Sequence, residues 1–501
     1  MITVPIDRLR GLATEMPTKS AITEAGVTIT FRELYARCSA VAQGLRAEGV
    51  TVGERIIYLG RNSTAFFEVA FGCALVGAVL APMNWRLTAE DIAELVADSG
   101  AELAFVERDF AGVVPEGIRT FVVGDTYEAW RNTHPRHDPG SEWDSEQEFI
   151  QFYTSGTTGL PKGVIVKNGN VAYLCRAGEH WQFDVDSVVV VAMPLFHMGG
   201  SAWGLVGLLA GAHCIVLPEF EPAAVVELLE SERVTNILVA PTMLQMLVAV
   251  PGIGERDFSH MTAIAYGSAP ISVQLLQRVL DVFNVPLIQL FGLTETTGAI
   301  SQLDPQDHRI ALLESVGRPY PWVELEIHDP DSGRPMGSGE VGEVWIRSPQ
   351  CSDGYWNRPE ETSALLTADG WLRTGDAGHL DAEGFLFLTD RIKEMIITGG
   401  ENVYPAEVER VMVEHPAVQE VAVIGAPHEQ WGEQVTAVVA LRDGFEESAE
   451  SLMEWARPRL AGFRRPRRIE FVEALPRNPT GKLLRREVRA AFWSQAGRRQ
   501  I

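Results

Sequence analysis

The sequence predicts an α/β protein: a large N-terminal domain of parallel-rich αβ sheets with a small β subdomain, followed by a small α+β C-terminal domain. Short apolar runs alternate with helical patterns up to about residue 320, alternating strand patterns fill about 320–390, and a separate strand–helix alternation occupies 391–501. Repeated strand–helix–strand segments pack as parallel sheets covered by helices. We therefore expect domains at 1–390 and 391–501.

Bulk composition limits the classes of protein that fit. With 501 residues the chain is too long for one hydrophobic core, and 46% hydrophobic with 22% charged residues is ordinary for a soluble protein. The net charge of −25, from 42 basic and 67 acidic side chains, argues against a nucleic-acid partner. Any anionic substrate must then meet a locally positive site.

Cysteine usage and hydropathy point to the cytoplasm. The five cysteines lack the spacing of a disulfide framework or a zinc site, which fits a reducing compartment. The N-terminus lacks a basic-then-apolar signal sequence. The longest apolar run, residues 69–83, includes Pro82 and is too short to span a bilayer. We expect a soluble cytoplasmic protein without a transmembrane segment; its oligomeric state, homodimer included, is left open.

The first 150 residues alternate helix and strand patterns. Thr30 and Glu33 have the spacing of a capping box, so a helix is expected to begin at Thr30. The other expected elements are strands at 55–59, 79–82 and 103–106, helices at 63–76 and after Thr88, and a connecting loop over 125–148.

Five further apolar runs follow, each ending at a turn or polar residue. They span 188–192, 214–217, 236–240, 263–266 and 287–291, and are interpreted as buried strands. In open α/β sheets ligands bind beyond the carboxyl ends of strands. Functional residues are therefore expected at 194–197, 240–242, 267–270 and 292–295. Residues 323–327 and 343–346 are expected to be strands of the β subdomain.

Residues 153–164 have the composition of a phosphate-binding loop. Thr154 to Gly159 are all Ser, Thr or Gly, and Pro161 and Lys162 follow. Glycine lets backbone N–H groups approach a ligand closely, and hydroxyl groups add donors, so such a run can surround a polyphosphate. Pro161 before Lys162 departs from the Walker A pattern. A flexible linker is the alternative, but an apolar strand-like run at 149–153 precedes this stretch.

The twelve residues 153–164 resemble, without a gap, the phosphate-loop signature of the adenylate-forming superfamily. This superfamily includes acyl-CoA synthetases, aryl-CoA ligases, luciferases and peptide-synthetase adenylation domains. The resemblance covers nearly the whole chain and is closest to bacterial medium- and long-chain fatty-acid–CoA ligases. It implies an enzyme that uses ATP, Mg²⁺ and coenzyme A to convert a carboxylic acid into an acyl-AMP and then into a thioester.

The resemblance also implies an ATP site. Phe291 would stack on adenine, although tyrosine is usual there and its hydroxyl is missing, and Glu295 and Thr154 would bind Mg²⁺. Asp376 would bind the ribose hydroxyls, and Arg391 the ribose and phosphate. The remaining implied ATP residues are Thr154, Ser155, Gly156, Thr157, Thr158, Gly159, Lys162, Gly267, Ser268, Ala269, Gly292 and Thr294.

Two reaction steps are implied by the C-terminal matches. Lys482 matches the lysine that stabilises charge between the carboxylate and the α-phosphate as acyl-AMP forms. Lys393 occupies the hinge position, about which the C-terminal domain rotates between steps. Gly399, Gly400 and Glu401 would then line the path of coenzyme A, where glycine lets the pantetheine arm pass close to the backbone.

The resemblance further implies an acyl pocket. Residues 194–197 resemble the family's motif beside the carboxylate, so His197 would orient the acid, and the other implied pocket residues are Gly200, Trp203, Met243, Gly267 and Gly298. The stretch offers no cation for a second carboxylate and no acidic residue for an amino group, so an apolar monocarboxylate is expected.

Several other functions are left open. An aryl, alicyclic or steroid acid is the alternative substrate. A protein that binds acyl-adenylate or coenzyme A without turnover is disfavoured by Lys162, Glu295, Asp376 and Lys482. A luciferase-like oxidase would need an oxygen-handling site that the sequence does not identify.

Overall fold

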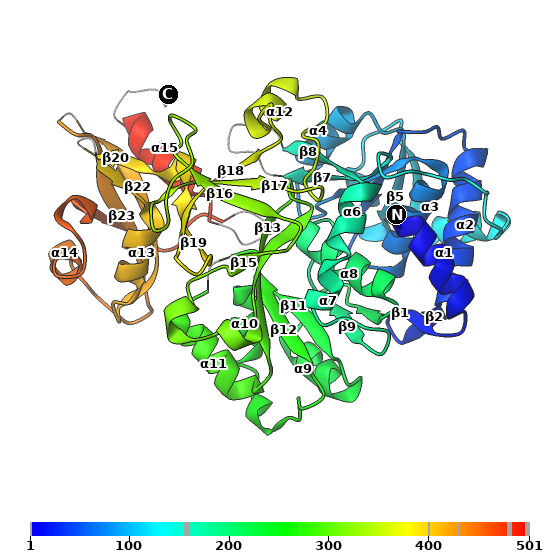
Figure 1. Ribbon diagram of the computed structural model, residues 1–501, viewed down its shortest axis with the longest axis horizontal. Coiled ribbons are helices and arrows are strands. Elements are labelled where there is room, and N and C mark those ends of the chain that lie inside the picture. Colours follow the sequence, from blue (N-terminus) through cyan, green and yellow to red (C-terminus); the bar gives the residue numbers. More distant parts are fainter. Residues whose placement is uncertain are drawn as a thin grey trace. The chain divides into compact units, whose positions relative to one another are not determined.

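The computed structural model (Figure 1) describes residues 3–154, 161–269, 271–398, 401–428, 430–477 and 483–495, without the side chains of Lys393, Asn402, Ser494 and Gln495. The chain divides into two compact units. The first is Met1–Leu325 with Ile346–Arg373, and the second is Glu326–Trp345 with Thr374–Ile501. Part of the predicted β subdomain therefore groups with the C-terminal residues, and the predicted domain boundary at residue 390 stays a prediction.

A six-stranded sheet forms part of the first unit, in the order β6-β5-β3-β4-β7-β8. Its strands are parallel except for the antiparallel pair β7–β8 at one edge. The strands are β3 (Arg55–Leu59), β4 (Val79–Met83), β5 (Leu103–Glu107), β6 (Arg119–Val123), β7 (Glu148–Thr154) and β8 (Lys162–Lys167). The accompanying helices are α2 (Phe31–Ala47), α3 (Thr64–Val76), α4 (Ala89–Ser99) and α5 (Thr126–Thr133).

A nine-stranded sheet has the order β15-β14-β13-β12-β11-β9-β10-β1-β2. The strands are β1 (Ser20–Glu24), β2 (Val27–Thr30), β9 (Val188–Val191), β10 (His213–Val216), β11 (Asn236–Val239), β12 (Ala263–Gly267), β13 (Leu287–Leu293), β14 (Gly298–Leu303) and β15 (Arg318–Pro319). The helices are α1 (Pro5–Glu15), α6 (Asn168–Leu174), α7 (Ala177–His180), α8 (Met198–Ala210), α9 (Pro222–Ser231), α10 (Pro241–Leu247), α11 (Val273–Phe283) and α12 (Pro359–Leu365).

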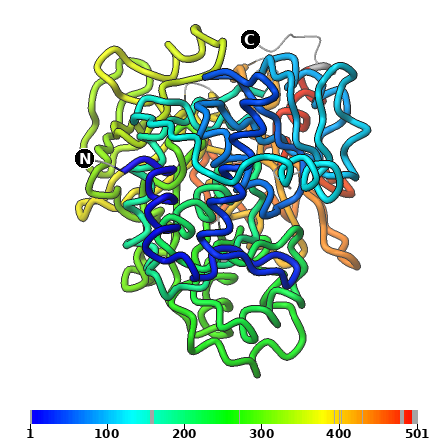
Figure 2. The backbone as a smooth tube through the Cα atoms, turned by 90° about the vertical axis from the view of Figure 1, so that its right-hand side faces the viewer, coloured from blue at the N-terminus to red at the C-terminus, as the bar shows by residue number. Residues whose placement is uncertain are grey.

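Segments far apart in the sequence complete this second sheet. β1 pairs in parallel with β10, with Ile22 opposite Cys214, and α1 packs against α8. Figure 2 shows the N-terminal residues in dark blue, and they lie next to the segment around residue 200. The sheet is parallel from β13 to β1 and antiparallel at both edges, where β14, β15 and β2 lie.

The second unit contains the C-terminal strands and helices. Its sheets have the orders β16-β17-β18-β19 and β21-β20-β23-β22, with β24 beside β23. The strands are β16 (Glu324–His328), β17 (Gly342–Arg347), β18 (Leu372–Leu380), β19 (Leu386–Arg391), β20 (Ile396–Thr398), β21 (Glu401–Val403), β22 (Val418–His428), β23 (Gly432–Leu441) and β24 (Arg468–Phe471). The helices are α13 (Pro405–Val413), α14 (Ala449–Ala456) and α15 (Arg485–Gln495).

The predicted α/β architecture is confirmed, with two local errors. Residues 125–148 were expected to be a loop, but they contain α5, whose Tyr127 is fully buried. The polar sequence hides this burial because Tyr127 and Arg131 bind a buried carboxylate, a contact that leaves no apolar pattern in the sequence. The expected capping box at Thr30 is half formed: Thr30 accepts from the Glu33 N–H, but the Glu33 carboxylate binds Arg37 and Arg136 instead.

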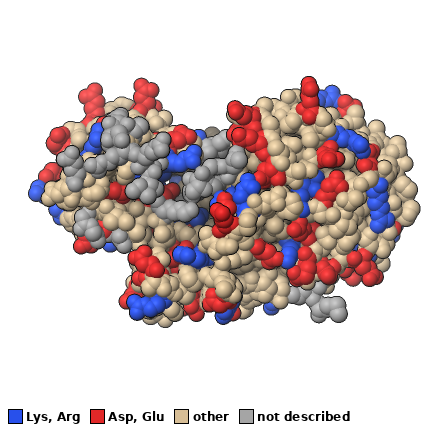
Figure 3. All heavy atoms as spheres, turned by 90° about the horizontal axis from the view of Figure 1, so that it is seen from above, with Lys and Arg blue, Asp and Glu red and all other residues tan. Residues whose placement is uncertain are grey.

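The surface reflects the composition. On the face drawn in Figure 3, acidic side chains are scattered over the whole surface rather than gathered in one patch. Among the described residues, no helix combines the length and apolar character needed to cross a bilayer.

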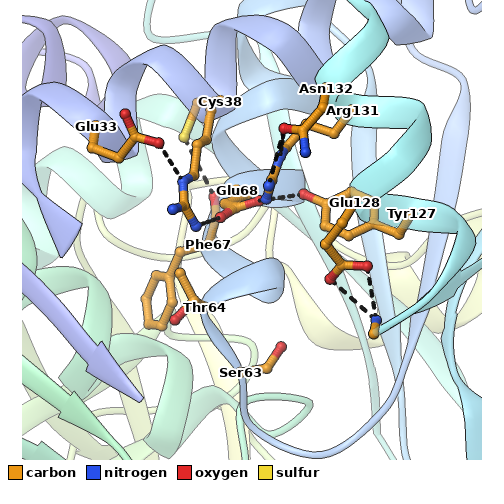
Figure 4. A network of polar contacts seen from close by, with 12 residues as sticks. Glu33, Cys38, Ser63, Thr64, Phe67, Glu68, Tyr127, Glu128, Arg131 and Asn132 are labelled. Atoms are coloured by element: carbon orange, nitrogen blue, oxygen red, sulfur yellow. Dashed lines mark hydrogen bonds and ion pairs between the residues drawn. The ribbon is translucent and has the colours of Figure 1, made fainter. Parts of the chain in front are cut away.

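One buried carboxylate joins three helices of the first unit (Figure 4). Glu68 on α3 is 1% exposed, and its Oε2 accepts hydrogen bonds from the Tyr127 hydroxyl and Arg131 Nη1, both at 2.6 Å. Its Oε1 accepts from Arg37 Nη1 of α2 at 3.2 Å. Burial and the nearby Glu68 charge raise the pKa of Tyr127, so this hydroxyl stays protonated and donates. The network ties α2, α3 and α5 together.

We expect Glu68→Ala to lower the free energy of unfolding of the first unit by about 3–5 kcal/mol, because it leaves buried Arg131 without its anion. Urea unfolding followed by tryptophan fluorescence measures the effect. Glu33→Ala is the control: its side chain is 35% exposed and also pairs with Arg37, so the loss should be about 0–1 kcal/mol. Equal losses in the two variants would contradict the role of the buried network.

Candidate active site

The two ends of the predicted phosphate loop lie opposite each other. Thr154 ends β7, Lys162 begins β8, and these two residues are paired in the antiparallel register. The loop that joins them includes the predicted phosphate-binding residues Ser155, Gly156, Thr157, Thr158 and Gly159, which lie outside the described residues. Gly163 follows Lys162, and a Cβ there would lie 2.5 Å from Nε2 of the fully buried Gln151. A side chain at position 163 would therefore have to displace Gln151, which is held by Arg55 and Tyr153.

Lys162 is held at the base of this loop. Its side chain is 17% exposed, and Nζ lies 4.0 Å from a Glu361 carboxylate oxygen. Nζ also lies 5.1 Å from the centre of the Tyr355 ring, within the range of a cation–π contact. The cation that should meet a phosphate is thus placed by a carboxylate and an aromatic ring.

The second predicted motif forms a β-hairpin. Leu293 of β13 pairs with Gly298 of β14, so residues 294–297 make the tip that carries Glu295. A Cβ on Gly292 would lie 2.0 Å from the Gly298 carbonyl oxygen, so the two strands approach this closely only with glycine at 292.

Side chains and strain fix the shape of the tip. Thr296 is fully buried, and its Oγ1 accepts from Leu293 N–H and donates to the Gly298 carbonyl, both at 2.8 Å. Thr297 has φ +51°, a left-handed conformation that a β-branched residue rarely adopts. Such strain persists where surrounding contacts over-determine the backbone, and it clusters at functional sites.

The tip presents Glu295 and lies near the predicted adenine-binding residues. Glu295 Oε1 accepts a hydrogen bond of 2.8 Å from the Tyr355 hydroxyl. Phe291, half-buried, lies on β13 of the same hairpin. Gly267 ends β12 opposite Leu290, and a Cβ on Gly267 would lie 2.3 Å from the Leu290 carbonyl oxygen. The loop that begins at Gly267 therefore starts beside the strand that carries Phe291.

His197 lies near the same loop. It is the N-cap of α8, and its Nδ1 accepts from the Gly199 N–H at 3.1 Å, which assigns the proton of a neutral ring to Nε2. A Cβ on Gly199 would lie 3.5 Å from Ser268 Oγ, so the start of α8 packs against the loop after β12. Ser268 has φ +65°, and its neighbour Ala269 is exposed.

The predicted acyl-pocket residues divide into two groups. Gly200 and Gly298 are sites of close packing: added Cβ atoms would lie 2.3 Å from the Pro194 carbonyl oxygen and 3.3 Å from Ala202 Cβ. Trp203 packs in the core instead, stacked on Trp181 at 5.3 Å with its Nε1 donating to the Val190 carbonyl. Met243 is half-buried on α10. The pocket itself stays a prediction.

The predicted ribose residues lie together in the second unit. Asp376 of β18 pairs with Arg391 of β19, and the Asp376 carboxylate lies 2.7 Å from Arg391 Nε. Thr374 Oγ1 accepts from the Asp376 N–H and donates to the Val344 carbonyl, which anchors this strand end. Gly375 has φ +69°, a turn conformation suited to glycine.

The predicted residues of the second reaction step are only partly described. Glu401 pairs with Thr398 between β21 and β20 and is exposed. Lys393 lies in a short 3₁₀ turn, Ile392–Glu394. Gly399, Gly400 and Lys482 lie outside the described residues.

Tyr355 and Gln350 contact the hairpin tip that carries Glu295, and the sequence analysis did not predict either of them. Both lie in the segment 350–356, between β17 and α12. The signal available in the sequence was the Gly354-Tyr355-Trp356 triplet, an aromatic cluster in an otherwise polar stretch. Its importance depends on contacts with residues about 60 and 190 positions away, which local patterns do not reveal.

The cysteines do not offer a nucleophile. Burial raises the pKa of Cys175, Cys214 and Cys351 to about 12 and raises that of Cys38 and Cys73 as well. Thiols with such values stay protonated near neutral pH and react slowly. Hydroxyl, carboxylate and cationic groups are therefore the chemistry available at this site.

Comparison with protein families gives two matches along the chain. Residues 10–356 match the model for AMP-binding enzymes, and residues 407–482 match the model for the C-terminal domain of AMP-binding enzymes.

Curated relatives match over almost their full length. A fatty acid–[acyl-carrier-protein] ligase, ScoC, of Streptomyces coeruleorubidus is 39% identical, with 96% of this chain and 95% of the relative aligned. A feruloyl-CoA synthase of an Amycolatopsis species is 37% identical, with 95% and 96% aligned.

Solved structures share the fold. The ATP-bound RpMatB-BxBclM chimera B3 superposes with a TM-score of 0.90 at 27% identity, covering 99% of this chain and 100% of that chain. A fatty acyl CoA synthetase of Mycobacterium tuberculosis gives a TM-score of 0.81 at 31% identity, covering 98% and 99%.

We expect Gly292→Ala to weaken the binding of MgATP at least about ten-fold, because the new Cβ forces the Glu295 tip away from its place and small misplacements at such sites are costly. Calorimetric titration with ATP and Mg²⁺ measures the affinity. Gly254→Ala is the matched control, since a Cβ there meets no atom within 4 Å. Unchanged affinity in a folded Gly292→Ala protein would contradict the geometry assigned to this hairpin.

Proposed function

The chain belongs to the AMP-binding enzyme family, and from this premise we propose that it activates an apolar monocarboxylate, with a medium- or long-chain fatty acid as its substrate. At the coarser level it is an AMP-forming acid–CoA ligase that works through an acyl adenylate. ATP and coenzyme A fit as its substrates.

One observation supports the site most strongly. Tyr355 contacts both predicted phosphate-site motifs: its hydroxyl donates to Glu295, and its ring lies 5.1 Å from Lys162 Nζ. This shared contact supports the proposal that a carboxylate and a cation more than 130 residues apart in the sequence act in one site. If Lys162 were an ordinary surface lysine and Glu295 an ordinary turn residue, a common contact with Tyr355 would not be expected.

In the first step a carboxylate oxygen of the acid attacks the α-phosphorus of ATP. The new C–O–P linkage forms as the bond from the α-phosphorus to the bridging oxygen breaks, and pyrophosphate leaves with the bonding electron pair. Lys162 and the loop from Thr154 would hold the β- and γ-phosphates, and Lys482 would stabilise the negative charge that develops at the α-phosphate. His197 would orient the acid.

Mg²⁺ fits the donor groups that this chain provides. Glu295 offers a carboxylate oxygen and Thr154 a hydroxyl oxygen, and Mg²⁺ prefers oxygen ligands from one or two side chains together with phosphates. The ion would neutralise phosphate charge during the transfer. The hydrogen bond from Tyr355 holds the Glu295 carboxylate in one orientation for this purpose.

Asp376 and Arg391 would bind the ribose. Each is already partnered by the other at 2.7 Å, so the carboxylate is fixed in place and can accept from the ribose hydroxyls. Phe291 would stack on the adenine.

In the second step the thiol of coenzyme A releases its proton to water, and its sulfur attacks the acyl carbonyl carbon. The thioester forms, and AMP leaves with the electrons of the acyl–oxygen bond. A rotation about Lys393 would bring Glu401 and the preceding glycines to the site. The cytoplasmic location and the homodimer stay predictions.

The apolar acid is favoured by the packing around Gly298. Gly298 packs closely against Ala202 of α8 and Leu174 of α6, so the side chains next to this predicted pocket position carry no charge. A fatty acid is named for one relative and a ferulic acid for another, so an aryl acid is the second candidate. The first relative is named as a ligase of an acyl-carrier protein, so an acyl-carrier protein is the second candidate for the acceptor of the acyl group.

The experiment that tests this function is a single incubation with ATP, Mg²⁺, coenzyme A and a panel of acids, followed by mass spectrometry. The panel runs from acetate through octanoate and palmitate to benzoate, ferulate and a steroid acid. We expect the octanoyl or palmitoyl thioester. An aromatic or steroid thioester would contradict the fatty-acid assignment. Accumulated acyl-AMP without a thioester would contradict coenzyme A as the acceptor.

We expect Lys482→Ala to lower the rate of acyl-AMP formation at least about a hundred-fold while leaving ATP affinity largely intact, because its charge acts in the transition state. Pyrophosphate release measures the first step, and calorimetry measures the binding. Lys19→Ala, on the turn that follows α1, serves as a lysine control. Pyrophosphate release at the wild-type rate would show that Lys482 has no part in adenylation.

A further inference from the structure

We propose that the segment 350–356 is a positioning device that holds the Glu295 tip and the base of the phosphate loop at a fixed separation, with Tyr355 as its principal positioning residue. The proposal rests on the proposed function, because it assigns the segment to the Mg²⁺- and phosphate-binding groups of that site. Neither Tyr355 nor Gln350 is itself placed on substrate; both act through other residues.

On one side, three residues of the segment donate hydrogen bonds to the hairpin tip. The Gln350 side chain is fully buried, and its Nε2 donates to the carbonyls of Thr296 at 2.9 Å and Ala299 at 2.8 Å, and more weakly to that of Thr297 at 3.4 Å. The Ser352 N–H donates to the Glu295 carbonyl at 2.8 Å. The Tyr355 hydroxyl donates to the Glu295 carboxylate. Backbone and side chain of the tip are thus both held.

On the other side the segment pairs with the edge strand β8. Trp356 N–H donates to the Gly163 carbonyl at 2.7 Å, and Ile165 N–H donates to the Gly354 carbonyl at 3.2 Å. Tyr355 lies opposite Val164 in an antiparallel bridge. Strand pairing of this kind fixes the register, so the position of Tyr355 is tied to that of Lys162, two residues before Val164.

The segment is itself rigidly anchored. The Tyr355 N–H donates to Thr362 Oγ1 at 3.0 Å, and Gly354, at φ +120°, leaves no room for a Cβ, which would lie 2.3 Å from Thr362 Cγ2. The Trp356 ring has the Arg55 guanidinium 3.4 Å from its centre, and its Nε1 donates to the Asp98 carbonyl. Because the segment is anchored and contacts both sides, it can fix the distance between the Glu295 tip and strand β8.

The strained tip explains why external support is needed. Thr297 at φ +51° would relax in an isolated hairpin, and the three carbonyls that accept from Gln350 lie around this residue. The Oε1 atom of the same amide accepts a hydrogen bond from Trp322 Nε1 at 2.9 Å. The amide is therefore oriented with its donor group toward the tip.

The hydroxyl of Tyr355 then has a specific task. By donating to Oε1 of Glu295, it fixes the rotation of the carboxylate and hence the direction of the other oxygen. A carboxylate that is already oriented binds a cation without first losing rotamer freedom. Removing the hydroxyl should therefore weaken binding that depends on Mg²⁺ and should leave binding that does not depend on Mg²⁺ unchanged. A merely structural role would affect both alike.

The test is Tyr355→Phe, which keeps the ring over Lys162 and removes only the hydroxyl. The probe is α,β-methylene-ATP, which cannot be cleaved at the reacting bond, titrated calorimetrically in Mg²⁺ and in EDTA. We expect about a ten-fold loss of affinity in Mg²⁺, the size of one hydrogen bond to a charged group, and no loss in EDTA. In turnover, the KM for MgATP should rise while the KM for the acid is unchanged.

The matched control is Tyr127→Phe, which also removes a tyrosine hydroxyl from a glutamate, at 2.6 Å, within the Glu68 network. It should lower the thermal midpoint and leave both affinities unchanged. Gln350→Met is a second variant, similar in length and unable to donate, and it should reproduce the Mg²⁺-dependent loss. This variant keeps the test decisive if Tyr355→Phe proves unstable.

Equal losses in Mg²⁺ and EDTA, or no loss in either, would overturn the proposal. The outcome is independent of which acid is activated. If no acid yields acyl-AMP while the loss at Tyr355→Phe remains specific to Mg²⁺, the proposed function fails and the positioning role stands. If wild-type adenylation proceeds and the variant binds the analogue like the wild type, the function stands and the positioning role fails.

Discussion

The close backbone approach of β13 and β14 at Gly292 is the constraint on which the rest of the site depends. It brings the Gly298 carbonyl within 2.0 Å of where a Cβ would be, so the hairpin closes tightly and residues 294–297 project as a short tip. Gly267 allows an equally close approach to Leu290 on the other side of β13. The predicted Mg²⁺ ligand Glu295 follows β13, and the predicted adenine-binding loop follows its neighbour β12, so the separation of the two is set by backbone packing rather than by flexible side chains.

Two cations that are predicted to bind ATP, one in each unit, are each paired with a carboxylate of their own unit. Lys162 lies 4.0 Å from Glu361, and Arg391 lies 2.7 Å from Asp376. In a chain with a net charge of −25, such pairs hold the two cations in place. A phosphate bound at Lys162 would therefore compete with Glu361 for this cation.

Local sequence patterns predicted the repeating part of the fold well. The β3 strand has the predicted limits, and the apolar runs that became β9 to β13 were found because buried parallel strands are short, continuous and bounded by turns. Both ends of the phosphate loop and the Glu295 turn were also predicted. Tyr355, Gln350 and α5 were not, because their roles depend on buried polar contacts with distant residues, and such contacts leave no periodic signal.

The pairing of β1 with β10 has a consequence for how the chain is made. Ile22 leaves the ribosome long before Cys214, its partner in the sheet. At the usual speed of synthesis, the β1–β2 hairpin waits about ten to forty seconds for the strand that completes it. During that interval its unpaired edge is open to other nascent chains. The β1–β2 hairpin is therefore a segment that chaperones would have reason to cover during translation.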